Sequence, residues 1–122
     1  MYKLLFIFLF LLCPVISKAD TLEEIFSGLP KEEWVWQSLH AIDMAQTIRI
    51  AKNPDKFQEL NPLLGKHPST SEVVAFAVAT SVSHAYLVYK LQEAGLPVKV
   101  FEYITIGYKG ITIKKNIDAG LH

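Results

Sequence analysis

The chain has 122 residues, which favours a single domain, and 51% of them are hydrophobic. It carries 12 Lys and Arg residues and 12 Asp and Glu residues, so no basic excess indicates a nucleic-acid partner. This apolar content is high for a small soluble domain and is typical of a membrane protein or an exported envelope protein.

The N-terminal stretch MYKLLFIFLFLLCPVISKAD has the layout of a secretory signal peptide. Small residues precede a predicted cut after Ala19, so we expect removal of residues 1–19 and a single small helical domain over 20–122. The apolar run is shorter than the ~20 residues that a membrane span needs. An uncleaved N-terminal anchor is the alternative. Cys13 is the only cysteine, so a cleaved chain would contain no disulfide, zinc–thiolate site or cysteine nucleophile.

A polar lead-in over 20–31 predicts one short helical turn. The first long helix is predicted over 31–52. Acidic residues lie at its N-terminus and basic residues at its C-terminus, where the helix dipole favours each charge, and an Asn-Pro pair ends it. Within it His40, Asp43 and Thr47 are three and four residues apart, so these three polar side chains share one face.

The stretch ELNPLLGKHPSTSE, residues 59–72, predicts a tight turn between two helices. Asn61 before a proline predicts the cap of a single turn that Gly65 ends. Ser69 with an acid three residues later is a capping box, which begins a second long helix ending near Glu93. Residues 73–89 carry no charge, and this length is at the lower limit for a membrane span.

The last segment has two interpretations. Its β-branched runs around Gly-Tyr-Lys-Gly allow a β-hairpin at 100–114. Its polar residues, however, recur every three or four positions, which predicts a helix over about 97–116 with a narrow polar stripe. The predicted fold is therefore all-α: a signal helix followed by a three-helix bundle, either embedded in the membrane or folded as a compact periplasmic domain.

The polar residues that the helix and turn signals do not fully explain form the candidate polar cluster. Asp43 lies mid-helix among apolar neighbours, and a buried carboxylate must be paired or hydrogen-bonded. Backbone amides or Asn61 are its expected partners. A metal site built from His40, Asp43, His67 and His84 is the alternative, although this spacing is far less specific than H-E-x-x-H. The cluster comprises His40, Asp43, Thr47, Glu59, Asn61, His67 and His84, with Glu102 as a further candidate.

Sequence signatures of common cofactor sites are missing: the chain has no P-loop, no Rossmann fingerprint and no G-x-S-x-G motif. We therefore assign no catalytic residue and expect no cofactor.

The patterns HAIDMAQT and ELNPLLGKHPS, followed by an apolar helix that carries a histidine, resemble a group of small uncharacterised exported or membrane proteins of proteobacteria and their prophages. The shared pattern is D-x-x-Q-T followed by E-x-N-P-x-x-G-x-H-P, and the similarity covers about residues 34–117. The resemblance implies a bacterial origin and a cell-envelope location, and it favours a helix for the last segment. It implies no activity.

The sequence thus predicts a bacterial cell-envelope protein that acts structurally or through a protein partner. The alternative is a small metal-binding or acid/base enzyme that uses the His, Asp and Glu cluster. The expected location is the inner membrane, with the periplasm as the alternative. No nucleic-acid partner is expected.

Overall fold

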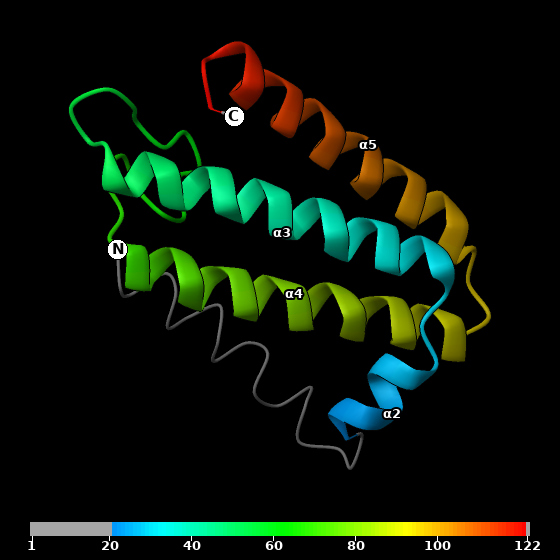
Figure 1. The fold of residues 1–122 in the computed structure, drawn as a ribbon. Helices are drawn as coiled ribbons and strands as arrows, with labels where there is room; N and C mark the ends of the chain where they lie inside the picture. The colour runs from blue at the N-terminus through cyan, green and yellow to red at the C-terminus, as the bar shows by residue number, and fades with distance from the viewer. Residues whose placement is uncertain (1–20, 122) are drawn as a thin grey trace.

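The computed structural model describes residues 21–121, so the predicted signal peptide lies outside the described residues. This part of the chain contains four helices and no strand (Figure 1). The prediction of an all-α fold is confirmed, and the alternative of a hairpin at 100–114 is wrong because that range lies inside a helix. The helices are α2 (Leu22–Ser27), α3 (Lys31–Lys52), α4 (Thr70–Glu93) and α5 (Val98–Asp118).

The segment between α3 and α4 ends in the predicted capping box. Ser69 Oγ accepts a hydrogen bond from the Glu72 amide at 3.2 Å, and the Glu72 carboxylate accepts one from the Ser69 amide at 2.7 Å. Earlier in the segment, Asn61 Oδ1 accepts from the Leu63 amide at 3.0 Å, and Gly65 has a φ of 76°. A side chain is disfavoured in this left-handed conformation, which explains the glycine. The predicted single turn between the two helices is therefore present.

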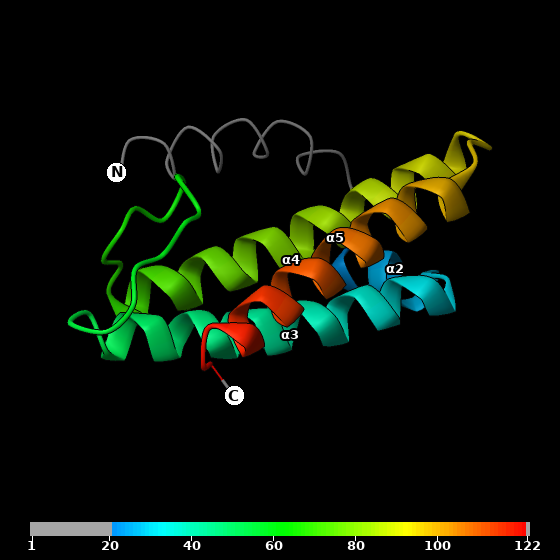
Figure 2. The same ribbon diagram turned by 90° about the horizontal axis from the view of Figure 1, so that it is seen from above.

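Helix α3 lies at the centre of the bundle and packs along both α4 and α5, whereas α4 and α5 touch each other little. The two outer helices meet near the 94–97 turn and diverge towards the opposite end, where the 53–69 segment lies (Figure 1); Figure 2 shows the bundle from above. Helix α2 packs on α4 through Ile25, which is buried against Ala85 and Tyr86. The divergence leaves a groove between α4 and α5, with α3 as its floor.

Large apolar side chains lie mostly on the outside of the bundle. Among residues 21–121, 16 large hydrophobic residues are exposed, whereas 11 hydrophobic residues form the buried core. Helix α5 is the clearest case because its single buried residue is an acid, Glu102, while Val100, Ile104 and Ile111 are each more than half exposed. The buried polar and charged residues are Glu32, Glu33, His40, Asp43, Gln46, Thr47 and Glu102.

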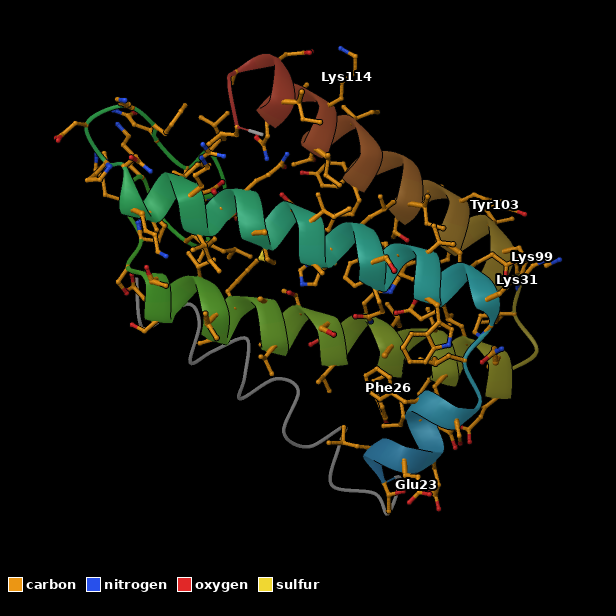
Figure 3. The ribbon with its side chains drawn as sticks, viewed as in Figure 1. Glu23, Phe26, Lys31, Lys99, Tyr103 and Lys114 are labelled. Atoms are coloured by element: carbon orange, nitrogen blue, oxygen red, sulfur yellow. The ribbon has the colours of Figure 1, made fainter. Side chains whose placement is uncertain are left out.

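Exposed charges lie only at the helix ends and in the connecting segments of the described chain. Figure 3 shows Lys31 and Lys99 at one end of the bundle and Lys114 towards the other. The bundle therefore has an apolar outer band between two charged ends and a polar line along its axis.

Candidate functional site

The polar line runs along α3 at helical spacing and faces the polar stripe of α5. Residues three or four positions apart lie on one face of a helix, so each helix presents one polar row to the other. The polar seam, as we call it, comprises Glu33, Gln37, His40, Asp43, Gln46 and Thr47 of α3 with Glu102, Thr105, Lys109 and Asn116 of α5.

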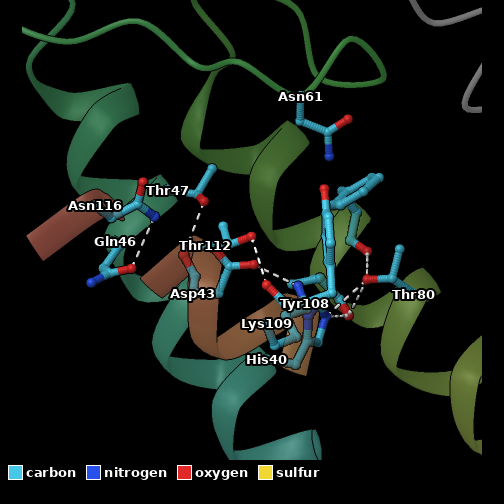
Figure 4. Close-up of polar contacts among 12 residues, drawn as sticks. His40, Asp43, Gln46, Thr47, Asn61, Thr80, Tyr108, Lys109, Thr112 and Asn116 are labelled. Atoms are coloured by element: carbon cyan, nitrogen blue, oxygen red, sulfur yellow. Dashed lines mark hydrogen bonds and ion pairs between the residues drawn. The ribbon is translucent and has the colours of Figure 1, made fainter. Parts of the chain in front are cut away.

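Asp43 forms an ion pair with Lys109 across the seam. Its Oδ2 lies 2.5 Å from Lys109 Nζ, and the two side chains are 8% and 12% exposed. Figure 4 shows Lys109 reaching Asp43 from α5, while Asn61 lies above the pair. The expected partner, Asn61, instead accepts a hydrogen bond from the Leu63 amide within its own turn. The side chain that balances Asp43 therefore comes from α5 and not from the turn.

His40 connects the seam to α4. Its Nε2 lies 2.8 Å from Thr80 Oγ1 and 3.0 Å from the Ala77 carbonyl oxygen. The Thr80 hydroxyl donates to the Phe76 carbonyl at 2.7 Å, so His40 Nε2–H is the donor towards α4. The other ring nitrogen of His40, Nδ1, is buried and has no partner within residues 21–121. With Nε2 protonated, Nδ1 is an unprotonated acceptor that no donor of the described residues satisfies.

Near the C-terminal end of α3, amide side chains replace charges. Asn116 Nδ2 donates to Gln46 Oε1 at 2.9 Å, and Gln46 Nε2 donates to the Leu121 carbonyl at 3.2 Å. These bonds hold the end of α5 and the residues after it against α3. Thr47 donates to the Asp43 carbonyl at 2.9 Å, so its hydroxyl proton is used within its own helix.

At the opposite end of the seam, three ionisable side chains come together: Glu33, His84 and Glu102. Glu33 Oε2 lies 2.8 Å from His84 Nδ1, and Glu33 Oε1 accepts a hydrogen bond from Gln37 Nε2 at 2.7 Å. Gln37 also accepts from the Ser81 hydroxyl at 2.5 Å. Glu33 is therefore tied to α4 through two side chains.

Trp36 separates the two halves of the seam. Its ring stacks on His84, with centroids 3.6 Å apart and planes 4° apart, and on His40 at 4.7 Å and 15°. Lys109 Nζ lies 5.6 Å from the centre of the same ring, within the range of a cation–π contact. Both imidazoles are thus fixed in orientation by one indole.

The groove between α4 and α5 contains a cavity of about 790 Å³. Its lining combines apolar side chains with polar groups of the seam and with residues 57–64 of the connecting segment. Six of the seven residues of the predicted cluster line it: His40, Asp43, Thr47, Glu59, Asn61 and His84.

His67 is the member of the predicted cluster that does not line the cavity, and it is exposed. Within residues 21–121 the group of side chains with metal-ligand spacing is Glu33, His84 and Glu102. The structure therefore does not bring His67 together with His40, Asp43 and His84 as the metal hypothesis required.

Glu59 has a structural role in the segment above the cavity. Its Oε1 accepts hydrogen bonds from the amides of Leu60 and Asn61, at 2.9 and 2.8 Å. Its own amide donates to the Lys66 carbonyl at 2.9 Å. These bonds close the 59–66 loop over one end of the groove, so Glu59 shapes the cavity mouth.

Sequence reasoning missed Glu33 and Lys109 as members of the site. Glu33 was explained as a favourable charge at a helix N-terminus, yet it is three residues before Trp36 and seven before His40, on the same face. Lys109 is one of the polar residues that recur every three or four positions in the last helix, with Glu102, Thr105, Thr112 and Asn116. Pairing this stripe with the polar face of α3 that carries Asp43 is the signal that could have identified Lys109.

The chain matches no protein-family model, and no curated protein or solved structure shows significant similarity to it.

Proposed function

We propose that this protein is a small integral membrane protein of the bacterial cell envelope, and that it acts by binding a protein partner in the groove between α4 and α5. The observation that carries the proposal is the inverted bundle: ionisable side chains in the interior and large apolar side chains on the outside. In water, exposed apolar surface of this extent is unfavourable. In lipid the same distribution is favourable, because polar side chains there face the bundle interior and pair with one another.

The lengths of the long helices agree with this proposal. α3, α4 and α5 have 22, 24 and 21 residues. At 1.5 Å per residue they are about 33, 36 and 32 Å long, against a hydrocarbon core of about 30 Å. By length and composition, α4 is the helix of the described chain that could cross a membrane, with a mean hydropathy of 1.3. Helices α3 and α5 carry charges, but the charges in their middle turns are turned into the seam.

The charged ends suggest an orientation. The end that holds the 53–69 segment and the C-terminus of α5 is richer in Lys and Arg than the other end, which by the positive-inside rule makes it the cytoplasmic end. The opposite end carries Lys31, Lys90 and Lys99. The basic residues of the cytoplasmic end are Arg49, Lys52, Lys56, Lys66, Lys114 and Lys115.

Binding is favoured over nucleophilic catalysis by the way the hydroxyl groups are used. Thr47, Thr80 and Thr112 each donate to the carbonyl oxygen four residues earlier, at 2.9, 2.7 and 3.0 Å. A nucleophile needs its proton directed at a base, and these protons point into their own helices. The groove instead offers a polar floor between apolar walls, a surface that fits the apolar face of a partner helix carrying one or two polar side chains.

Substituted cysteines test the membrane location. In a Cys13→Ser background we would place one cysteine at Val78, which is 60% exposed on the outer band, and compare it with Lys66→Cys in the connecting segment. In permeabilised cells, whose membranes retain their lipid, a water-soluble maleimide should label Lys66→Cys and leave Val78→Cys unlabelled. Rapid labelling of both positions, with release of the protein by alkaline carbonate, would overturn the membrane proposal in favour of a periplasmic domain.

A photo-crosslinking residue tests the groove. Placed at Thr112, which lines the cavity, it should give a discrete protein adduct in cells. Placed at Val35 on the outer face, where the side chain is 50% exposed, it should give lipid adducts alone. Identical adduct patterns from the two positions would mean that the groove has no dedicated partner.

A further inference from the structure

Glu102 is a buried acid whose ionisable neighbours are Glu33 and His84. Its side chain is buried, at 0% exposure, on α5. No amide, hydroxyl or cationic side chain within residues 21–121 donates a hydrogen bond to its oxygens, and the polar group that lies against it is the carboxyl of Glu33. A carboxylate removed from water needs a proton, a charged partner or a metal ion. The geometry around it decides which of these fits.

Glu33 faces the same space and is also 0% exposed. Its oxygens are engaged by Gln37 at 2.7 Å and by His84 Nδ1 at 2.8 Å. No Lys or Arg is paired with Glu33 or Glu102 in the described chain. Two carboxylates therefore meet in one buried space without a fixed cation, and one divalent ion would neutralise both.

The ligand atoms are already gathered. One carboxylate oxygen of Glu33, one of Glu102 and one ring nitrogen of His84 lie within 4.8 Å of one another. Imidazole nitrogen and carboxylate oxygen bind Zn²⁺ at about 2.0–2.2 Å, so small side-chain shifts would bring all three onto one ion. The three ligands come from α3, α4 and α5, so the ion would tie the three long helices together.

The surroundings of His84 prepare it as a metal ligand. Its Nε2 lies 3.0 Å from Thr105 Oγ1, and the Thr105 hydroxyl donates to the Glu102 carbonyl at 3.1 Å. With the Thr105 proton used in this way, His84 Nε2–H is the donor and Nδ1 carries a lone pair, so its 2.8 Å contact with Glu33 Oε2 requires either a proton or a metal ion shared by the two atoms. Metal-binding histidines are commonly oriented by such a second hydrogen bond. The stacking of Trp36 on the imidazole holds the ring plane.

We propose that Glu33, His84 and Glu102 form a binding site for a divalent transition-metal ion such as Zn²⁺. Three protein ligands leave a fourth tetrahedral position for water or for a group of a bound molecule. The proposal goes beyond the partner-binding function and does not depend on it, because the three side chains are buried inside the bundle in either a membrane or water. A proton shared between the two carboxyl groups, with no metal, is the competing arrangement.

The first experiment uses the wild-type chain, purified without a histidine tag and stripped with a chelator. Titration with Zn²⁺ should saturate at one ion per chain and raise the melting temperature. Co²⁺ should bind at the same stoichiometry and give the visible absorption of a tetrahedral nitrogen–oxygen site. Failure of both ions to bind stoichiometrically would overturn the proposal and favour the shared proton.

Variants then locate the ion. Glu102→Gln and His84→Gln should each lose Zn²⁺ binding by at least 10-fold. Thr105→Val should weaken binding about 10-fold or more, as expected for loss of an outer-shell partner, and Thr105→Ser should restore it. Asp118→Asn is the control, because that carboxylate is exposed, is paired with Lys114 and lies at the other end of α5; the Zn²⁺ affinity of this variant should equal that of the wild-type chain.

Two results from these variants would overturn the site even if wild-type protein binds metal. One is wild-type affinity in Glu102→Gln. The other is loss of binding in His67→Ala, since His67 is exposed and lies outside the cluster. If Glu102→Gln does not fold, the location of the ion is tested by the Co²⁺ absorption spectra of Thr105→Val and Thr105→Ser. A metal bound elsewhere would give the wild-type spectrum in both variants, and that result would overturn the site.

Discussion

The ion pair between Asp43 and Lys109 offers the sharpest test of the bundle interior. Its atoms are 2.5 Å apart and its side chains are 8% and 12% exposed. At an effective dielectric constant of about 20, the attraction at that distance is about 7 kcal/mol, and desolvation offsets much of it. Removing one partner leaves the other charge buried, so Lys109→Met should lower the free energy of unfolding by about 3–5 kcal/mol.

The same pair can be removed as a whole. Asp43→Leu combined with Lys109→Met leaves no uncompensated charge, so the double variant should recover most of the stability that Lys109→Met loses. Its change in the free energy of unfolding should therefore be smaller than the sum of the changes in the two single variants. A matched control exists in Lys114 and Asp118, which are 2.6 Å apart but 76% and 60% exposed. Lys114→Met should change stability by at most about 0.5 kcal/mol.

Unfolding by SDS in mixed micelles, followed by circular dichroism, would supply these free energies for the double variant, for its two single variants Asp43→Leu and Lys109→Met, and for Lys114→Met. The reasoning requires a coupling energy of at least about 2 kcal/mol between Asp43 and Lys109, a value in the range measured for contacting residues. Additive single and double variants, or equal effects of Lys109→Met and Lys114→Met, would refute it and would mean that water reaches the pair.

Three further outcomes are expected. Ser69→Ala should cost about 1 kcal/mol of stability in the same unfolding assay, because it removes an observed N-cap, whereas Thr70→Ala beside it should change stability by a few tenths; equal losses would argue against the cap. His67→Ala should also change stability by only a few tenths of a kcal/mol, since the side chain is exposed, and a loss above about 1 kcal/mol would reveal an unseen contact. N-terminal sequencing of protein recovered from the envelope should begin at Asp20, and a sequence that begins at Met1 would exclude cleavage after Ala19.

The helices could be predicted from local signals. Asn53-Pro54 ends α3, the capping box begins α4, and Pro97 precedes α5, so each boundary depends on residues within one turn of it. The helical nature of α5 followed from the spacing of its polar residues despite its strand-like composition. The β-branched residues that gave the segment its strand-like composition, such as Ile104 and Ile111, lie on the exposed outer face of α5. They do not pair with a strand in the described part of the chain.

The pairing of polar residues could be predicted only in part. Asp43 was expected to need a partner, but Asp43 and Lys109 are 66 positions apart in sequence, and helix periodicity gives the face of each helix without the register between helices. The role of Glu33 in the site could not be predicted for another reason. An acid in the first turn of a helix is fully explained by the helix dipole, so no residual signal indicated that Glu33 is also buried beside His84 and Glu102.

The Asp43–Lys109 pair also constrains how the chain could be assembled in a membrane. During synthesis α3 emerges before α5, and the partner of its buried carboxylate is 66 residues further along the chain. An unpaired charge in mid-helix opposes entry into the hydrocarbon region. α3 would therefore have to remain beside the insertion channel, or at the membrane surface, until α5 has been made. The synthesis of α5 would thus set the moment at which α3 is released into the lipid, and a chain truncated before α5 would leave α3 without a stable position in the bilayer.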